Sequence, residues 1–91
     1  MAEARITFVG SLDISTVTSF TEQVQAAAQG SDRIVVDCTE MEFLDSTGVR
    51  GLVVLKQQMA SMGKQLVFEG FGSHIIDILD ILGIREVVID A

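Results

Sequence analysis

A chain of 91 residues has room for one small domain and leaves none for a second, catalytic one. Thirteen acidic residues against six basic ones give a net charge of −7, which disfavours nucleic acids and anionic membrane surfaces as partners. No apolar run approaches the length of a membrane span and no secretory signal is visible, so we expect a soluble cytoplasmic protein without membrane insertion.

The first half of the chain predicts a strand, a helix and a second strand. Residues 5–9 are typical of a strand, and Gly10 of a turn after it. Apolar residues then recur at the spacing of a helix with one buried face: Ile14, Val17, Phe20, Val24 and Ala27. Gly30 is the expected end of this helix. Residues 33–38 follow as a strand dense in β-branched side chains, and its cysteine, Cys38, is expected to be buried and unpaired.

The second half predicts two helices and two strands. A helix is expected over residues 46–62, a strand over Gln65–Glu69, a helix from Ser73 to just before Gly83, and a last strand over Glu86–Asp90. Four strands therefore alternate with three helices. Such alternation is typical of an α/β domain with a mainly parallel sheet and right-handed crossovers.

Asp45, Ser46, Thr47 and Gly48 lie where the second strand gives way to a helix. Ser46 is a suitable N-cap there, and Gly48 would let the helix approach the sheet closely. A helix N-terminus also favours a phosphate group, so Ser46 is either a cap only or the carrier of a regulatory charge. Because an added phosphate would join Asp45 on an already acidic surface, it would leave the fold intact while repelling a partner.

Catalytic and cofactor sites find little support in the sequence. The Asp-Thr-Gly signature of aspartic proteases is interrupted by Ser46. A serine nucleophile would need a base, and nothing in the spacing brings the single histidine, His74, to Ser46. One cysteine and one histidine cannot make a zinc site, and Gly70 and Gly72 lack the lysine and spacing of a nucleotide-binding loop. We expect no enzyme activity, no metal and no cofactor.

Three pieces of the sequence together resemble the STAS domain family and, in size and layout, its stand-alone anti-sigma factor antagonists. They are the turn Gly10 to Asp13, the run Phe43 to Gly48, and the ending Leu82 to Ile84. The resemblance covers residues 5–90 of a single domain, residues 1–91.

The resemblance implies a STAS-like fold and a protein without catalysis of its own. In its unphosphorylated form it would bind an anti-sigma factor that is also a serine kinase, and so release the sigma factor. The kinase would phosphorylate Ser46, and a metal-dependent serine phosphatase would reverse the reaction. Asp13 is implied to contact the kinase and Asp45 to orient the serine, while Thr47 and Gly48 belong to the same partner-binding motif.

The chain departs from the family pattern at Arg50, where many members have a glycine; here Gly51 comes one place later. On the first turns of its helix, Arg50 is placed to pair with a phosphate on Ser46 or with Asp45, and so to change partner specificity. Many members also have an additional N-terminal strand, for which only residues 1–4 remain. An unswitched adaptor subunit of a transporter or signalling complex is the alternative function, and a small hydrolase using Ser46 and His74 a third.

Overall fold

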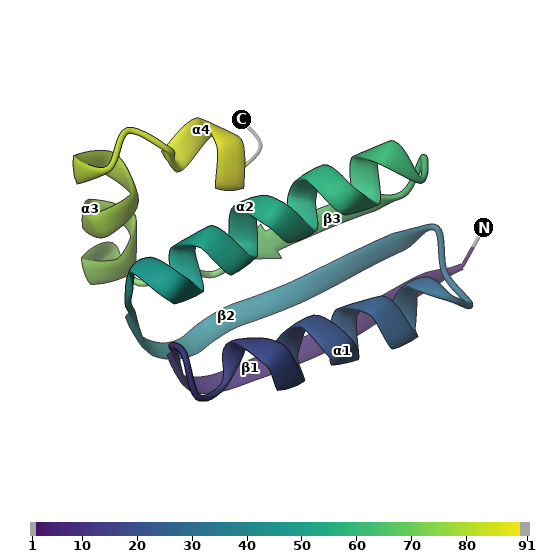
Figure 1. Cartoon of the computed structure of the whole chain (residues 1–91), viewed down its shortest axis with the longest axis horizontal. Helices are drawn as coiled ribbons and strands as arrows, with labels where there is room; N and C mark the ends of the chain where they lie inside the picture. Colours follow the sequence, from purple (N-terminus) through teal and green to yellow (C-terminus); the bar gives the residue numbers. More distant parts are fainter. Residues whose placement is uncertain (1, 90–91) are drawn as a thin grey trace.

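The computed structural model describes residues 2–89. In chain order the elements are β1 (Glu3–Leu12), α1 (Val17–Ala28), β2 (Arg33–Leu44), α2 (Ser46–Ser61), β3 (Gln65–Glu69), α3 (Ser73–Ile81) and α4 (Arg85–Val88), as Figure 1 shows. The predicted α/β alternation and the single small domain with a parallel sheet are confirmed.

The strands form one parallel sheet in the order β1-β2-β3, with β2 in the centre. Helix α1 connects β1 to β2 and α2 connects β2 to β3, and both helices lie on the same face of the sheet (Figure 1). The core lies between these two layers. Ile34 and Val36 of β2 are fully buried there against Leu52 and Leu55 of α2. Cys38 belongs to this core and has no disulfide, as predicted.

The opposite face of the sheet is polar. Arg5 reaches from β1 across the sheet to Glu69 on β3, and Arg33 pairs with Glu3. Beneath these long side chains, Val35 of the central strand is only 1% exposed although it lies outside the main core cluster. The aliphatic stems of the charged residues therefore shield an apolar side chain on the face that carries no helix.

Strand β2 is two residues longer than β1, and both extra residues lie in its second half. The register slips between Thr7 and Val9 and again between Gly10 and Ser11, each time with the additional residue on β2. Core-facing residues of β2 accordingly change from a step of two to a step of three: Ile34, Val36, Cys38, Met41 and Leu44. The predicted turn at Gly10 is therefore wrong, since pairing continues to Leu12 with Gly10 at φ 99°.

The predicted fourth strand is also wrong: residues 85–88 form helix α4, and the described part of the sheet has three strands rather than four. Gly83 ends α3 at φ 71°, as its position predicted. The Ile84 amide then bonds back to the Leu79 carbonyl (3.0 Å), which turns the chain onto α2 and α3. Val88 is fully buried in that position. Asp90, the predicted end of the strand, lies outside the described residues.

Helix α1 begins three residues after Ile14. The Asp13 carbonyl accepts from the amides of Thr16 (3.1 Å) and Val17 (2.8 Å), which makes residues 13–16 a turn. The spacing predicted that Ile14 would join the core. In this turn Ile14 is instead 78% exposed. None of the helices formed by residues 2–89 combines the length and the apolar character needed to cross a lipid bilayer.

Candidate functional site

The carboxyl ends of β1 and β2 meet at one edge of the sheet, where the Asp45 amide donates to the Leu12 carbonyl (3.3 Å). This bond brings the turn that begins at Asp13 beside the start of α2. In a parallel sheet, the ends of neighbouring strands are the usual place for a functional site. The structure thus brings together the two segments that the sequence singled out.

Asp45, and not Ser46, is the N-cap of α2. Its backbone is extended, its Oδ1 accepts from the Gly48 amide (2.8 Å), and its carbonyl accepts from the Val49 amide (2.9 Å). Ser46 is the first helical residue. The predicted cap is therefore displaced by one residue, because the carboxylate can reach the third amide of the helix from the position before it.

The Ser46 side chain is exposed at the start of α2, and no hydrogen bond among the described residues uses its hydroxyl. Thr47 is half-buried beside it. Because Asp45 supplies the capping acceptor, the cap of α2 does not depend on the Ser46 hydroxyl.

Gly48 packs directly against the end of β1. The position of a Cβ atom on Gly48 falls on the Leu12 carbonyl group, so no larger residue fits without movement of the backbone. The close approach predicted for this glycine is thus present, and it holds the first turn of α2 against the segment that leads into Asp13.

The Asp13 carboxylate organises its own turn. Its Oδ1 accepts from the Ser15 hydroxyl (2.7 Å) and amide (2.9 Å) and from the Thr16 hydroxyl (3.3 Å). These bonds, those of Ser15 above all, hold the pKa of Asp13 below its usual value, so the carboxylate is charged at neutral pH. Sequence reasoning did not predict that Ser15 and Thr16 hold Asp13.

Arg50 is exposed on α2, four residues and about one helical turn after Ser46. Of the two pairings that the sequence predicted for Arg50, the one with Asp45 is not among the ion pairs of the described residues. Side chains four residues apart lie on the same face of a helix, so Arg50 and Ser46 share one face of α2.

Two exposed apolar side chains accompany the polar ones. Ile14 follows Asp13 and is 78% exposed, while Phe43 precedes Asp45 by two residues and is 52% exposed. Sequence reasoning missed both, since Ile14 fits the apolar spacing of α1 and Phe43 lies in a strand. An acidic and hydroxyl-bearing centre flanked by exposed apolar side chains is suited to contact with another protein.

Among the described residues, His74 makes no hydrogen bond with Ser46. Its Nε2 lies 3.0 Å from the Glu42 carbonyl oxygen, so the imidazole links the first turn of α3 to β2. Helix α3 begins at Ser73, as predicted, and Gly72 holds its N-cap position. Within residues 2–89, no three His, Cys, Asp or Glu side chains gather as metal ligands.

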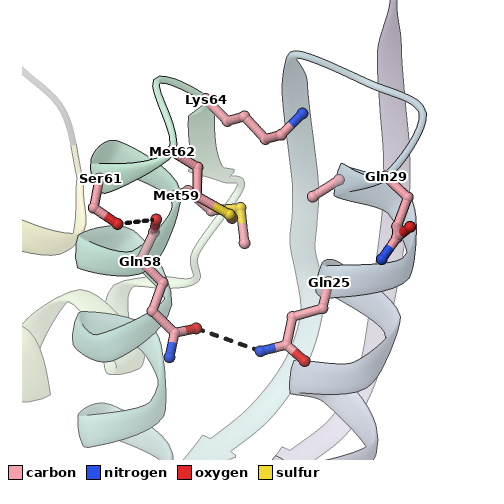
Figure 2. Close-up of a pocket in the computed structure, with 8 residues that line it drawn as sticks. Gln25, Gln29, Gln58, Met59, Ser61, Met62 and Lys64 are labelled. Atoms are coloured by element: carbon pink, nitrogen blue, oxygen red, sulfur yellow. Dashed lines mark hydrogen bonds between the residues drawn. The ribbon is translucent and has the colours of Figure 1, made fainter.

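A separate hollow of about 570 Å³ lies at the other end of the helical layer, between the C-terminal turns of α1 and α2 (Figure 2). Gln25 donates to Gln58 across it (3.4 Å), and Lys64 donates to the Ser31 carbonyl (2.9 Å). Met59 and Met62 line its apolar side. None of the predicted site residues lines this hollow.

The chain belongs to the STAS domain family: the family described as "Mlab, STAS domain" matches residues 1–89. No curated protein sequence matches it.

Among the solved structures that share its fold are two of SpoIIAA and one of a sulfate transporter family protein. The anti-sigma factor antagonist SpoIIAA in its unphosphorylated form is 16% identical, with a TM-score of 0.76 over 98% of this chain and 79% of that one. The Bacillus cell fate determinant SpoIIAA in its phosphorylated form is 19% identical, with a TM-score of 0.69 over 98% and 82%. A sulfate transporter family protein from Wolinella succinogenes is 13% identical, with a TM-score of 0.81 over 94% and 70%.

Proposed function

We propose that this STAS domain is an anti-sigma factor antagonist whose binding to a serine kinase that is also the anti-sigma factor is controlled by phosphorylation of Ser46. The observation that carries the proposal is the exposed, unbonded Ser46 hydroxyl at the start of α2, beside the Asp13 turn. Two of the similar structures are of SpoIIAA, one of them in a phosphorylated form.

Phosphorylation of Ser46 is compatible with the fold. The kinase transfers the γ-phosphoryl group of ATP to Ser46 Oγ and releases ADP and a proton; a serine phosphatase returns the hydroxyl and inorganic phosphate by hydrolysis. The new charge of roughly −2 stands at the positive end of the α2 dipole, where anions are stabilised. Because Asp45 already caps the helix, the phosphate replaces no existing hydrogen bond.

In this chain, Arg50 forms an ion pair with the phosphate on Ser46. A phosphate on Ser46 and the Arg50 guanidinium lie at positions i and i+4 of one helix, a spacing that favours opposite charges. Arg50 thereby neutralises part of the added charge within the chain, and the phosphorylated form remains as stable as the unmodified one.

Partner release follows from desolvation. Ile14 and Phe43 provide apolar contact on the two segments that meet beside Ser46, and Asp13 provides a fixed negative charge. In a closed interface, a phosphate near Asp13 and Asp45 would have to give up water while facing like charges. The unphosphorylated domain therefore binds the kinase and the phosphorylated domain leaves it, with no catalysis by this chain, in the cytoplasm.

The proposal is tested in the cells that make the protein. A tagged chain is purified and its intact mass measured before and after treatment with a serine phosphatase. A mass excess of one phosphate, mapped to Ser46 and lost on treatment, is expected. Ser73→Ala is the matched control, because Ser73 is likewise an exposed serine at the first position of a helix. Absence of the modification under every growth condition would count against the proposal.

Binding is tested with the kinase that copurifies with the wild-type chain. Ser46→Ala is expected to keep the complex and Ser46→Asp to weaken it at least tenfold, whereas Ser73→Asp leaves it unchanged. Equal binding of the Ser46→Ala and Ser46→Asp variants would exclude the switch.

An unswitched adaptor of a transporter or signalling complex is the second candidate. The observation that favours it is the structural likeness to a sulfate transporter family protein, with a TM-score of 0.81. This function predicts a stable partner whose affinity is the same for wild type, Ser46→Ala and Ser46→Asp, and a chain that carries no phosphate.

A further inference from the structure

Strand β1 forms one outer edge of the sheet, and within residues 2–89 nothing pairs with the side of β1 that faces away from β2 (Figure 1). This edge is ten residues long, twice the length of β3 at the other edge. Natural proteins usually keep edge strands short or interrupt them, because unpaired backbone groups accept a further strand.

The pleat of β1 is unbroken along most of this edge. The two extra residues of the irregular pairing belong to β2, so β1 itself alternates regularly from Glu3 to Val9. Its exposed side chains are those of Glu3, Arg5, Thr7 and Val9, and its inward side chains those of Ala4, Ile6 and Phe8. A regular, unblunted strand is the kind of edge onto which another strand adds.

A hollow of about 230 Å³ runs beside this edge, under α1. It is lined by residues of β1 and by residues of α1 and the turn before it, and by none of β2: Thr7, Phe8, Val9, Ser15, Thr16, Ser19, Phe20 and Gln23. Phe8 and Phe20 meet edge to face at its base, with ring centroids 5.3 Å apart. The lining carries no charged side chain, which distinguishes it on a chain with a net charge of −7.

We propose that this edge is the contact between two copies of the chain, which pair their β1 strands antiparallel about a two-fold axis perpendicular to the sheet and form one continuous sheet of six strands. The axis keeps the helical layers of both copies on the same face. Among the inward side chains of each β1, the small Ala4 then lies beside the uncharged hollow of the other copy, opposite Phe8.

The sequence of β1 is self-complementary about Ile6. Centred there, antiparallel pairing places Ala4 opposite Phe8 on the inward face, so a small side chain meets a large one. On the outward face it places Arg5 opposite Thr7 and Glu3 opposite Val9, so no like charges face each other.

The neighbouring registers are worse. Pairing centred on Arg5 would bring two guanidinium groups together, and pairing centred on Thr7 would extend into Gly10, whose φ of 99° departs from the extended conformation. Pairing centred between two residues would place inward side chains of one copy opposite outward side chains of the other. The helical layers of the two copies would then lie on opposite faces of the sheet.

The test uses the full chain and two substitutions of opposite charge at Thr7. Sedimentation equilibrium over a wide concentration range is expected to show a monomer–dimer equilibrium. Thr7→Arg places an arginine opposite Arg5 twice per dimer and is expected to weaken dimerisation about tenfold, whereas Thr7→Glu pairs with Arg5 and strengthens it by a similar factor. Overall charge alone would have the opposite effects. Thr7→Arg lowers the net negative charge and so reduces repulsion between two copies, whereas Thr7→Glu raises both.

Thr18→Arg and Thr18→Glu are the matched controls, because Thr18 is an exposed threonine on α1 outside the hollow. They are expected to follow overall charge alone. Amide hydrogen exchange of residues 4–9 should slow as the protein concentration rises.

A chain that stays monomeric at all concentrations would overturn the proposal. So would Thr7 variants that move in the same directions as the Thr18 variants, or β1 amides protected equally at every concentration, which would mean that another segment covers the edge. Failure of this proposal is distinguishable from failure of the Ser46 switch, because sedimentation is measured on the unphosphorylated chain alone and neither Ser46 nor Arg50 lines the hollow, although Ser15 and Thr16, which hold Asp13, do.

Discussion

Gly48 on α2 and the Leu12 carbonyl on β1 touch so closely that the space of a Cβ atom is already filled by backbone. We expect Gly48→Ala to lower the free energy of unfolding by about 2–3 kcal/mol, since either the helix or the strand end must move. Urea denaturation measures this loss.

Gly51 provides the control for that substitution. A Cβ atom there would meet only the Val17 Cγ2 atom, a side-chain atom rather than backbone, and alanine favours the helix by about 1 kcal/mol over glycine. Gly51→Ala should therefore change stability by less than half as much as Gly48→Ala. Equal losses would show that the Leu12 contact is not special.

Removal of the Asp45 cap should separate its structural role from its charge. Asp45→Ala deletes the acceptor of the Gly48 amide and is expected to cost about 1 kcal/mol of stability. Asp45→Asn keeps an acceptor without the charge and should restore most of that loss in thermal or urea unfolding. If partner binding is weakened by both variants alike, Asp45 acts on the partner through its charge rather than through the helix.

The hydrogen bonds to Asp13 make part of the stability depend on pH. Because they lower the pKa of the folded state, they contribute fully above the unfolded pKa of about 3.9, and the contribution is lost as the pH falls through the folded value. Ser15→Ala should therefore destabilise the chain more at pH 7 than at about pH 3. Thr18→Ala, which removes an exposed hydroxyl of α1 outside the hollow beside β1, should act equally at both pH values.

Burial above all, together with the charges of Asp37 and Glu69, raises the pKa of the Cys38 thiol to about 12. The reactive thiolate is therefore scarce in the folded protein at pH 8. We expect a thiol-specific reagent to label the native chain only at the rate at which it opens, and the chain in denaturant completely. Rapid labelling without denaturant would contradict this burial.

Local patterns predicted most of the fold because they agree with the tertiary contacts. Strand β3 has the predicted bounds, and Phe20 and Val24 face the core at their helical spacing. The last segment shows where local pattern fails: Val87 and Val88 favour a strand, yet after the short connection at Gly83 they belong to a helix that packs on α2. Gly10 was predicted as a turn, but it lies within β1 at an irregularity of the pairing with β2. That irregularity depends on the length of β2, which a local pattern around Gly10 does not reveal.

The candidate site was predicted in outline and not in detail. Parallel strand order places Asp13 and Asp45 at one edge, so their proximity follows from topology. Whether Asp45 or Ser46 is the N-cap depends on a difference of one residue in where α2 begins. Helix boundaries predicted from sequence are uncertain by more than one residue. The exposure of Ile14 depends on a turn held by Asp13, which spacing alone cannot distinguish from the first turn of a helix.

The two extra residues of β2 determine the orientation in which the chain enters the segment Asp45 to Gly48. With each extra residue, the spacing between successive core-facing side chains becomes three residues instead of two. Leu44 therefore faces the core immediately before Asp45. A single-residue deletion in this stretch, such as loss of Thr39, would reverse the alternation and turn Leu44 outward. Tolerance to insertion and deletion should therefore be lowest in residues 38–44, even though Thr39, Glu40 and Glu42 are exposed and would accept most substitutions.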